Sequence, residues 1–76
     1  MNSYKCYLVS DLASELNIPR TTVNDWLKTY GPYLESELRG KRKVYPERTL
    51  HILQEIKTMR DNGASPNVIE QDLAQR

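Results

Sequence analysis

Residues 21–30 constrain the fold of this chain more than any other stretch, because they suit a short helix with two different faces. One set of apolar side chains repeats at spacings of three, four and seven, so these side chains share a face that can be buried. They are Val23, Trp26, Leu27 and Tyr30. The polar residues between them are of the kind that reaches base edges and phosphates in a DNA major groove. They are Thr21, Thr22, Asn24, Asp25 and Lys28.

A second short helix is predicted immediately upstream, where apolar side chains in residues 12–16 have helical spacing. Asn17 tolerates the left-handed backbone of a tight turn, and Pro19 suits the opening of the next helix. Two short helices joined by a tight turn, the second with a polar outer face, form a helix-turn-helix. We therefore predict this motif over residues 10–30.

Three local signals are expected to mark the ends of these two helices. Ser10 is a suitable N-cap for the first helix. Thr22 with Asp25 three positions later matches a capping box in the second. Gly31 suits a left-handed C-cap, and the proline after it cannot continue the helix.

A basic β-hairpin is predicted next, over residues 33–45, with its turn at Gly40. Four cationic residues fall within residues 39–43. Such a segment can be a solvated loop that protects a sheet edge from aggregation. Directly after a helix-turn-helix, we favour a wing that clamps a phosphate backbone.

Two further helices are predicted, over residues 46–62 and 65–75. The first begins at a proline and carries an apolar stripe formed by Leu50, Leu53, Ile56 and Met59. The second begins with a Ser-Pro pair, and its apolar residues are expected to fold back on the first; they are Val68, Ile69 and Leu73. Residues 1–9 suit a short strand or an arm. The predicted fold is mainly α with a small β-hairpin wing, a four-helix winged helix-turn-helix, in one domain over residues 1–76.

Composition excludes several classes of function. The one cysteine, Cys6, and the one histidine, His51, cannot form a disulfide or the usual zinc frameworks. No paired carboxylates, activated nucleophile or Gly-rich phosphate loop stands out, so we expect no enzyme, no cofactor and no metal. No apolar run suits a membrane span or signal peptide, and a small domain without disulfides suits a reducing cytoplasm. We therefore expect no membrane partner and, with the helix-turn-helix and wing predicted above, a cytoplasmic, nucleoid-associated protein.

The charge distribution is more informative than the overall net charge of +1. Residues 20–48 contain seven lysines and arginines against four carboxylates, a net charge of +3. Residues 1–19 and 49–76 each carry a net charge of −1. The positive charge therefore lies beside the predicted recognition helix, as expected of a DNA-binding surface.

The order of these segments resembles the DNA-binding domain of the MerR family. Residues 12–13 and 17–23 look like its helix-turn-helix. The pattern from wing to fourth helix is carried by Tyr45, Leu50, Ile56, Met59, Arg60, Gly63, Ala64, Ser65 and Ile69. The resemblance covers nearly the whole chain. It implies double-stranded DNA binding in a bacterial transcriptional regulator.

Residues 22–28 look closer to the Trp-bearing branch of that family, which includes RacA-like chromosome-anchoring proteins and plasmid partition adaptors. Typical MerR activators carry a Tyr pair where this chain has Asp25 and Trp26, and an Arg where it has Asn24. Their wing glycine also lies one position later than Gly40 relative to the closing tyrosine. The resemblance implies a homodimer formed through a segment absent from this chain. We therefore expect the N-terminal part of a longer protein, with no small-molecule effector evident.

The candidate DNA contacts on the second helix are Arg20, Thr21, Thr22, Asn24, Asp25 and Lys28. Asn24 and Thr21 are the candidates for base edges, since Asn can pair bidentately with adenine. Asp25 would accept from a cytosine amino group, or repel phosphates and sharpen the register. Thr22, Arg20 and Lys28 would hold phosphates at the rim of the groove.

The candidate contacts on the wing are Arg39, Lys41, Arg42, Lys43 and Tyr45. The four cations would engage the flanking backbone, or one arginine would enter the minor groove. Tyr45 could belong to the DNA surface or to the core, whereas Trp26 and Tyr30 are predicted to be core residues.

Other functions remain open from the sequence. Within DNA binding, these are a segregation or chromosome-anchoring adaptor and a phage or plasmid excisionase. A different class is a protein-interaction module, which would bind a partner peptide in a groove between helices. The apolar stripe of the third helix would then be partly exposed.

Overall fold

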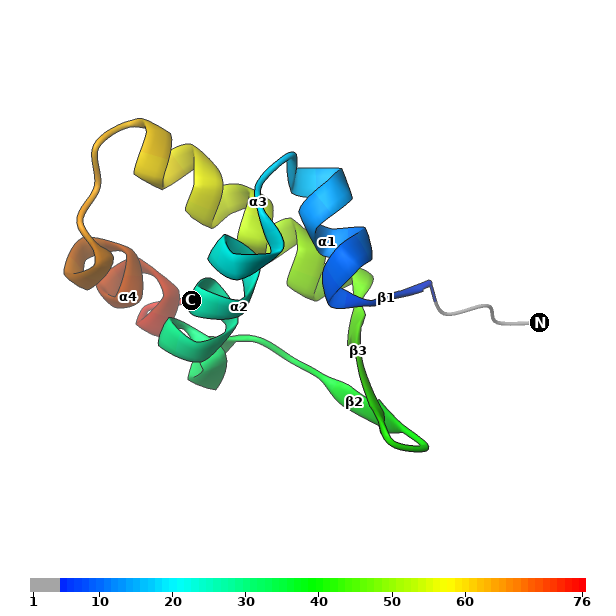
Figure 1. The fold of residues 1–76 in the computed structure, drawn as a ribbon. Coiled ribbons are helices and arrows are strands. Elements are labelled where there is room, and N and C mark those ends of the chain that lie inside the picture. Colours follow the sequence, from blue (N-terminus) through cyan, green and yellow to red (C-terminus); the bar gives the residue numbers. More distant parts are fainter. Residues whose placement is uncertain (1–4) are drawn as a thin grey trace.

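Residues 5–76, which the computed structural model describes, fold into four α-helices and a three-stranded antiparallel sheet (Figure 1). The helices are α1 (Val9–Leu16), α2 (Arg20–Thr29), α3 (Glu47–Asp61) and α4 (Pro66–Ala74). The strands are β1 (Cys6–Tyr7), β2 (Glu37–Arg39) and β3 (Arg42–Pro46), and a 3-10 turn, η1, spans Gly31–Tyr33. The predicted four-helix winged helix-turn-helix is therefore confirmed. The part of the N-terminal prediction that concerns residues 1–4 lies outside the described residues.

The turn between α1 and α2 has the predicted left-handed residue. Asn17 has φ 57° and ψ 45°, which only a few residue types adopt at low cost. Its backbone N–H donates to the Ser14 carbonyl, and the next N–H, that of Ile18, donates to the Ala13 carbonyl. These bonds satisfy carbonyls at the end of α1, so the chain leaves this helix abruptly and enters α2 after two more residues.

Both N-cap predictions for the helix-turn-helix are wrong. The backbone N–H of Leu8 donates to the Asp11 carboxylate at 2.9 Å, so Leu8 is the N-cap and Ser10 lies inside the first turn of α1. The cap of α2 is Pro19, with no side-chain capping bond, so the Thr22 capping box does not form. In α1, an acidic side chain that reaches back to the chain before the helix replaces the hydroxyl cap.

The prediction of a left-handed Gly31 is also wrong. The chain continues from α2 into η1 instead, and the backbone N–H of Tyr33 donates to the Tyr30 carbonyl at 2.9 Å. The N–H of Leu34 then donates to the Gly31 carbonyl at 3.0 Å. The tighter turn satisfies these carbonyls without a left-handed residue, and Pro32 fits its first turn because it needs no N–H partner there.

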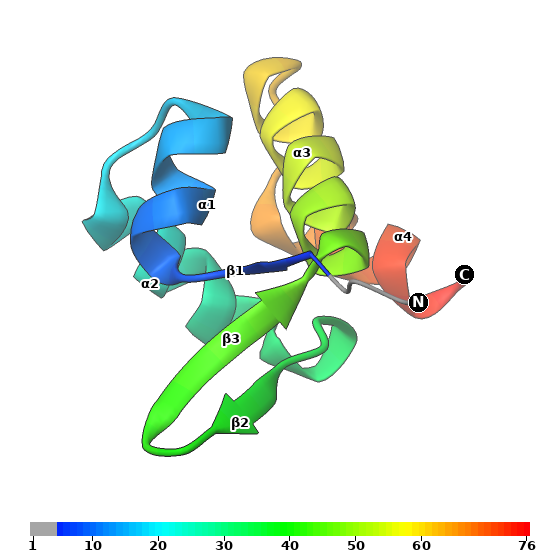
Figure 2. The ribbon, with the colours of Figure 1, turned by 90° about the vertical axis from the view of Figure 1, so that its right-hand side faces the viewer.

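The sheet has the strand order β1-β3-β2, and its β2–β3 hairpin is the wing. Leu38 pairs with Lys43 and Arg39 pairs with Arg42, so Gly40 lies in the two-residue turn, at φ +63°. The hairpin extends away from the helices at the edge of the molecule (Figure 2). Strand β1 pairs with the inner end of β3 through Tyr7 and Tyr45, which joins the wing to the body of the domain.

The start of α3 holds the segment that leads into β2, the other strand of the wing. Thr49 has no exposed surface, and its hydroxyl donates to the Glu35 carbonyl at 2.7 Å. The guanidinium of Arg48 donates to the Glu35 carboxylate, also at 2.7 Å. Glu35 lies two residues before β2, so the base of the wing is held by α3 on one side and by β1 on the other.

One hydrophobic core lies between the helices and the inner end of the sheet. The predicted core positions Trp26 and Tyr30 are 8% and 1% exposed. The stripe on α3 is buried at Leu50, Leu53 and Ile56, with Met59 packed at its edge. The other core residues are Tyr7, Leu12, Ala13, Leu16, Val23, Tyr45, Ile69 and Leu73.

The prediction for α4 is confirmed at its start and wrong at one apolar position. The Ser65 hydroxyl accepts from the backbone N–H of Val68 at 3.4 Å, as expected of an N-cap. Ile69 and Leu73 are four residues apart and share the buried face of the helix. Val68 is 53% exposed, because it lies about 100° around the helix from Ile69.

Candidate nucleic-acid interface

The exposed side of α2 carries a polar stripe. Arg20, Asn24 and Lys28 are exposed and spaced by four residues, so they follow one another along one face of the helix. Thr21 is exposed beside the first two of them. The opposite side of the helix is anchored in the core by Val23 and Trp26. The predicted division of α2 into a buried apolar face and an exposed polar face is therefore confirmed.

The first half of this stripe lines an open hollow of about 570 Å³ beside the N-terminal end of α1. Its lining residues are Leu8, Val9, Ser10, Arg20, Thr21 and Asn24. Three of the predicted contact residues thus lie together around one concave surface. The guanidinium, hydroxyl and amide groups of these residues can serve both phosphates and base edges.

The second end of the stripe meets the wing. Lys28 lines a hollow of about 230 Å³ together with Lys43 from β3. The other lining residues are Leu27, Gly31, Leu34, Ser36 and Tyr45. The fold therefore brings together two predicted cationic contacts that are 15 positions apart in the sequence.

One predicted contact on α2 lies away from the stripe, and another lies at its edge. Thr22 is half-buried and lies about 160° around the helix from Asn24. Asp25 is exposed and lies about 40° around the helix from Thr21 and about 60° from Lys28. The structure therefore groups Asp25, but not Thr22, with the exposed polar residues of α2.

The register of the hairpin divides the wing cations between two faces. Cross-strand partners lie on the same face of a sheet, and faces alternate along a strand. Lys43 therefore shares a face with Leu38, and we call this the inner face because Lys43 lines the hollow shared with α2. Arg39 and Arg42 share the outer face. Lys41 lies in the turn.

The cations of this surface have no carboxylate partner within residues 5–76. Each of them is exposed, and none forms an ion pair with an Asp or Glu of that part of the chain. They are Arg20, Lys28, Arg39, Lys41, Arg42 and Lys43. Arg48, by contrast, is paired with Glu35 at 2.7 Å. Positive charge is therefore left available to an external anion along both α2 and the wing.

Tyr45 lies mainly in the core. It is 8% exposed, and burial raises the pKa of its phenol above the ordinary value of 10.0. The side chain is therefore a neutral hydroxyl at physiological pH. Because it also lines the hollow between Lys28 and Lys43, part of the side chain remains at the surface. Of the two roles that the sequence left open for Tyr45, the core role is the one observed.

Sequence reasoning missed two residues of this surface, Ser36 and Leu38. Ser36 lines the hollow between α2 and the wing. Leu38 is 73% exposed on the inner face of the wing, opposite Lys43. A two-residue turn at Gly40 fixes the pairing of Leu38 with Lys43, so the sequence contained the signal for Leu38. No sequence pattern indicated Ser36, which precedes β2.

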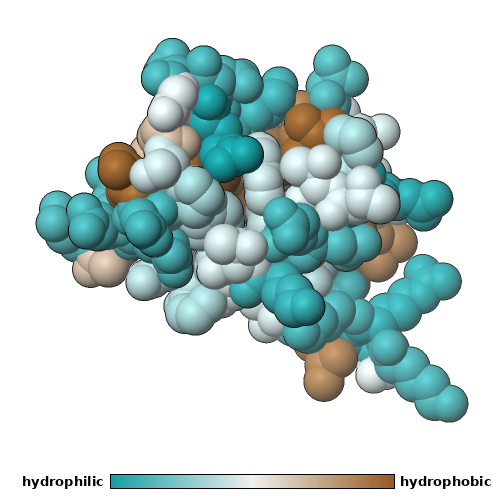
Figure 3. All heavy atoms as spheres, turned by 60° about the vertical axis from the view of Figure 1, so that its left-hand side comes forward, coloured by the Kyte–Doolittle hydropathy of each residue, from teal (hydrophilic) through white to brown (hydrophobic). Residues whose placement is uncertain are grey.

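A third hollow lies between α3 and the C-terminal end of the chain. It is open, measures about 560 Å³ and is lined by His51, Gln54, Glu55, Thr58, Met59 and Arg76. On the face seen in Figure 3, hydrophilic residues predominate and apolar residues form small separate patches. In the described part of the chain, no helix has the length and apolarity to cross a membrane, and no cluster of side chains suits a metal ion.

The chain matches a known protein family. The model of the MerR HTH family regulatory proteins matches residues 7–75, which include all four helices and the wing. No curated protein and no solved structure matched the chain.

Proposed function

Because the chain belongs to the MerR family of helix-turn-helix regulatory proteins, we propose that it binds double-stranded DNA sequence-specifically, as part of a bacterial transcriptional regulator. Helix α2 enters the major groove and the wing binds the backbone beside it. One observation carries this proposal. The polar stripe of α2 and the wing adjoin at a shared hollow, and their cations lack carboxylate partners within residues 5–76.

In this proposal, base edges are read from the middle of α2. Asn24 is exposed at the centre of the stripe, and its amide can donate to and accept from one adenine. Thr21 lies beside it on the same hollow and can contact a neighbouring base. Thr22 lies off the stripe and supports the packing of α2. Asp25, at the edge of the stripe beside Thr21 and Lys28, accepts from a cytosine amino group or repels phosphate on its side of the helix.

Phosphates are held at both ends of α2 and along the wing. Arg20 lies at the first turn of α2 and Lys28 at its last turn, and the wing adds four further cations. Affinity should therefore fall with salt, with a slope of about 0.9 logarithmic units for each phosphate neutralised. These contacts fix the position of α2 on the duplex but do not distinguish sequences.

A single domain of this size buries roughly 600–1,000 Å² on DNA, which limits its specificity. We therefore propose that two copies bind half-sites about one helical turn apart. When sites are selected from a random duplex library with the protein at saturating concentration, we expect two half-sites in inverted orientation with this spacing.

Fluorescence anisotropy with a labelled random duplex tests the proposal first. At low salt, the duplex should bind, and affinity should fall steeply as salt rises. A protein-interaction module of this size should not bind duplex at all, and that result would contradict the proposal. Selection from a random duplex library then tests specificity, since a non-specific binder would enrich no common site.

A genome-wide map of bound positions tests the regulatory role. Peaks at promoters would support a transcriptional regulator. A clustered array of sites, as expected of a segregation adaptor, or one attachment site, as expected of an excisionase, would overturn that role. Either outcome would leave DNA binding itself intact.

A further inference from the structure

The hollow between α2 and the wing has the position and charge of a binding site for a single phosphate group. We propose that Lys28 and Lys43 hold one and the same phosphate of the DNA backbone, as a clasp closed from two sides. This inference rests on the proposed DNA binding. It adds that the recognition helix and the wing bind the same phosphate of the DNA and not two separate phosphates.

The first argument is the geometry of the hollow. It measures about 230 Å³ and is the most enclosed of the hollows that border α2. Lys28 approaches from the last turn of α2, and Lys43 approaches from the inner face of β3. The volume is several times the roughly 30 Å³ that one water molecule occupies in the liquid, so a phosphate group fits.

The second argument is charge. Both lysines are exposed, and neither is paired with a carboxylate from residues 5–76. No acidic residue lines the hollow. Two ammonium groups that border one concave surface repel each other, and an anion between them relieves the repulsion. The Ser36 hydroxyl and the hydroxyl of neutral Tyr45 add neutral hydrogen-bond donors to the same lining.

The third argument is the shape of DNA. One sugar–phosphate strand separates a major groove from the adjacent minor groove. If α2 lies in the major groove and the wing lies at the minor groove, that strand must pass between them. The hollow is the place where the surfaces of α2 and the wing meet, so this strand would lie against Lys28 and Lys43 together.

The wing is held firmly enough to form one side of such a clasp. Its base is fixed by the buried hydrogen bond from Thr49 to the Glu35 carbonyl and by the pairing of β1 with β3. Gly31 also lines the hollow, and it has no side chain that would occupy the space. The relative position of α2 and β3, from which the two lysines project, is therefore set by the fold before DNA arrives.

The salt dependence of binding to a random duplex tests the clasp. If both lysines neutralise one phosphate, Lys28→Ala and Lys43→Ala should each lower the slope by less than 0.9 units, and the double variant by about 0.9 units in total. If they neutralise two phosphates, each single variant should lower the slope by about 0.9 units and the double variant by about 1.8 units. The second result would overturn the proposal. A double variant with the same salt slope as the wild-type chain would also overturn it.

A second double variant provides the control. Arg42 lies on the outer face of the wing and is expected to neutralise a phosphate of its own, so adding Arg42→Ala to Lys28→Ala should lower the slope by about 0.9 units more than Lys28→Ala alone. Lys57→Ala on α3 should leave the slope unchanged. Thermal melts of every variant verify that the domain remains folded.

A scan of the selected site with single methylphosphonate linkages gives a second, independent readout. The wild-type chain should bind more weakly when one particular linkage is neutralised. Lys28→Ala and Lys43→Ala should both become less sensitive at that same linkage, and the double variant should be insensitive there. Loss at two different linkages would overturn the clasp. Failure of the wild-type chain to bind any duplex would instead contradict the proposed function.

Discussion

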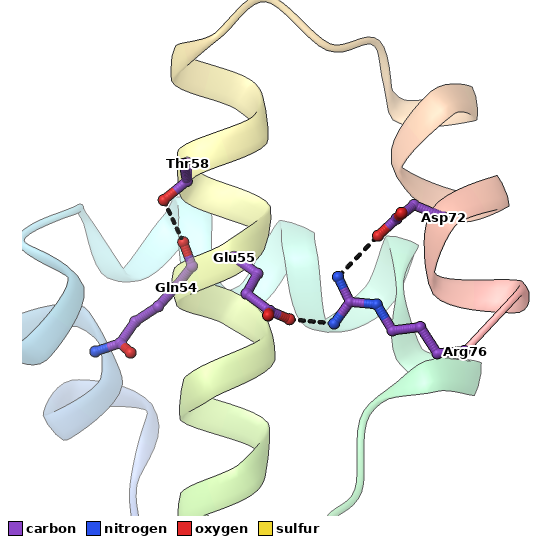
Figure 4. A network of polar contacts seen from close by, with 5 residues as sticks. All are labelled: Gln54, Glu55, Thr58, Asp72 and Arg76. Atoms are coloured by element: carbon purple, nitrogen blue, oxygen red, sulfur yellow. Dashed lines mark hydrogen bonds and ion pairs between the residues drawn. The ribbon is translucent and has the colours of Figure 1, made fainter.

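Two surfaces of this small domain use their charges in opposite ways. The α2–wing face comprises the exposed residues of α2 and of residues 37–46, and it carries six cations against two carboxylates. The α3–α4 face comprises the exposed part of residues 47–76. This stretch contains four lysines and arginines against five carboxylates. There, Arg76 donates to both Glu55 and Asp72 (Figure 4).

The difference indicates what each surface is built for. Hydrogen bonds to Glu55 and Asp72 raise the pKa of Arg76, so its charge is satisfied within the fold. The cations of the α2–wing face have no such partners within residues 5–76, so their charge is left available to an external anion. The ion pairs of Arg76 therefore support the structure, whereas the α2–wing face is available for binding.

The largest expected effect comes from removing the charge of the wing. Replacing Arg39, Lys41, Arg42 and Lys43 together by glutamine should weaken binding to every duplex at least about a hundredfold at 0.15 M salt, because several phosphate contacts are lost. The control is Lys57→Gln with Arg60→Gln on α3, which removes two charges and should change affinity less than about twofold. Anisotropy titrations of both variants make the comparison. An equal loss of binding free energy per charge removed in the two variants would show that only overall charge matters.

The next largest effect is expected at the centre of the recognition stripe. Asn24→Ala should cost ~1–3 kcal/mol on the selected site and little on random duplex, since it removes contacts to base edges. Asn67→Ala, an exposed asparagine on α4, should cost nothing on either duplex. Competition titrations with both duplexes provide the measurement. If Asn24→Ala weakens both duplexes equally, this residue does not read bases.

A smaller effect should separate the two exposed large apolar residues. Leu38 lies among the wing cations and can pack against deoxyribose, whereas Val68 lies on α4. Leu38→Ala should weaken DNA binding by about 1 kcal/mol, the value of burying one or two CH₂ groups. Val68→Ala should leave affinity unchanged. If Val68→Ala weakened DNA binding and Leu38→Ala did not, the DNA would lie on the α3–α4 face.

The smallest effect is expected for the ion pairs of the α3–α4 face. Arg76→Ala should lower the free energy of unfolding by about 0.2–1 kcal/mol, because half-exposed pairs contribute little. It should leave DNA affinity unchanged. Urea denaturation and anisotropy measure the two quantities on one preparation. A loss of DNA affinity without a loss of stability would mean that Arg76 itself contacts DNA.

The sequence predicted the fold well where burial alone determines the pattern. The apolar spacing in residues 21–30 and along α3 reports directly which side of each helix is buried. Helix ends were predicted less well, because more than one residue near each end suits a cap. At α1, the helix begins with Leu8 as the N-cap, two residues before Ser10, and the Asp11 carboxylate accepts from the Leu8 N–H. At Gly31, a 3-10 turn replaces the left-handed cap.

The candidate site was predictable in its residue types and less so in its arrangement. Spacing along α2 placed Asn24 and Lys28 among the polar residues away from the buried face, together with Thr22, which the structure shows to be half-buried. That Lys28 and Lys43 line one hollow depends on how the wing is oriented. Part of that orientation comes from the bond between the Thr49 hydroxyl and the carbonyl of a residue 14 positions away. A backbone carbonyl leaves no trace in the sequence, so no pattern could have revealed this bond.

The most direct test of the account is an NMR titration of the labelled chain with duplex DNA, which reports on every backbone amide at once. We predict that the largest shift changes fall in residues 20–28 and 36–43, with little change in residues 51–60 and 66–76. Changes concentrated on α3 and α4, with α2 and the wing unaffected, would contradict the account.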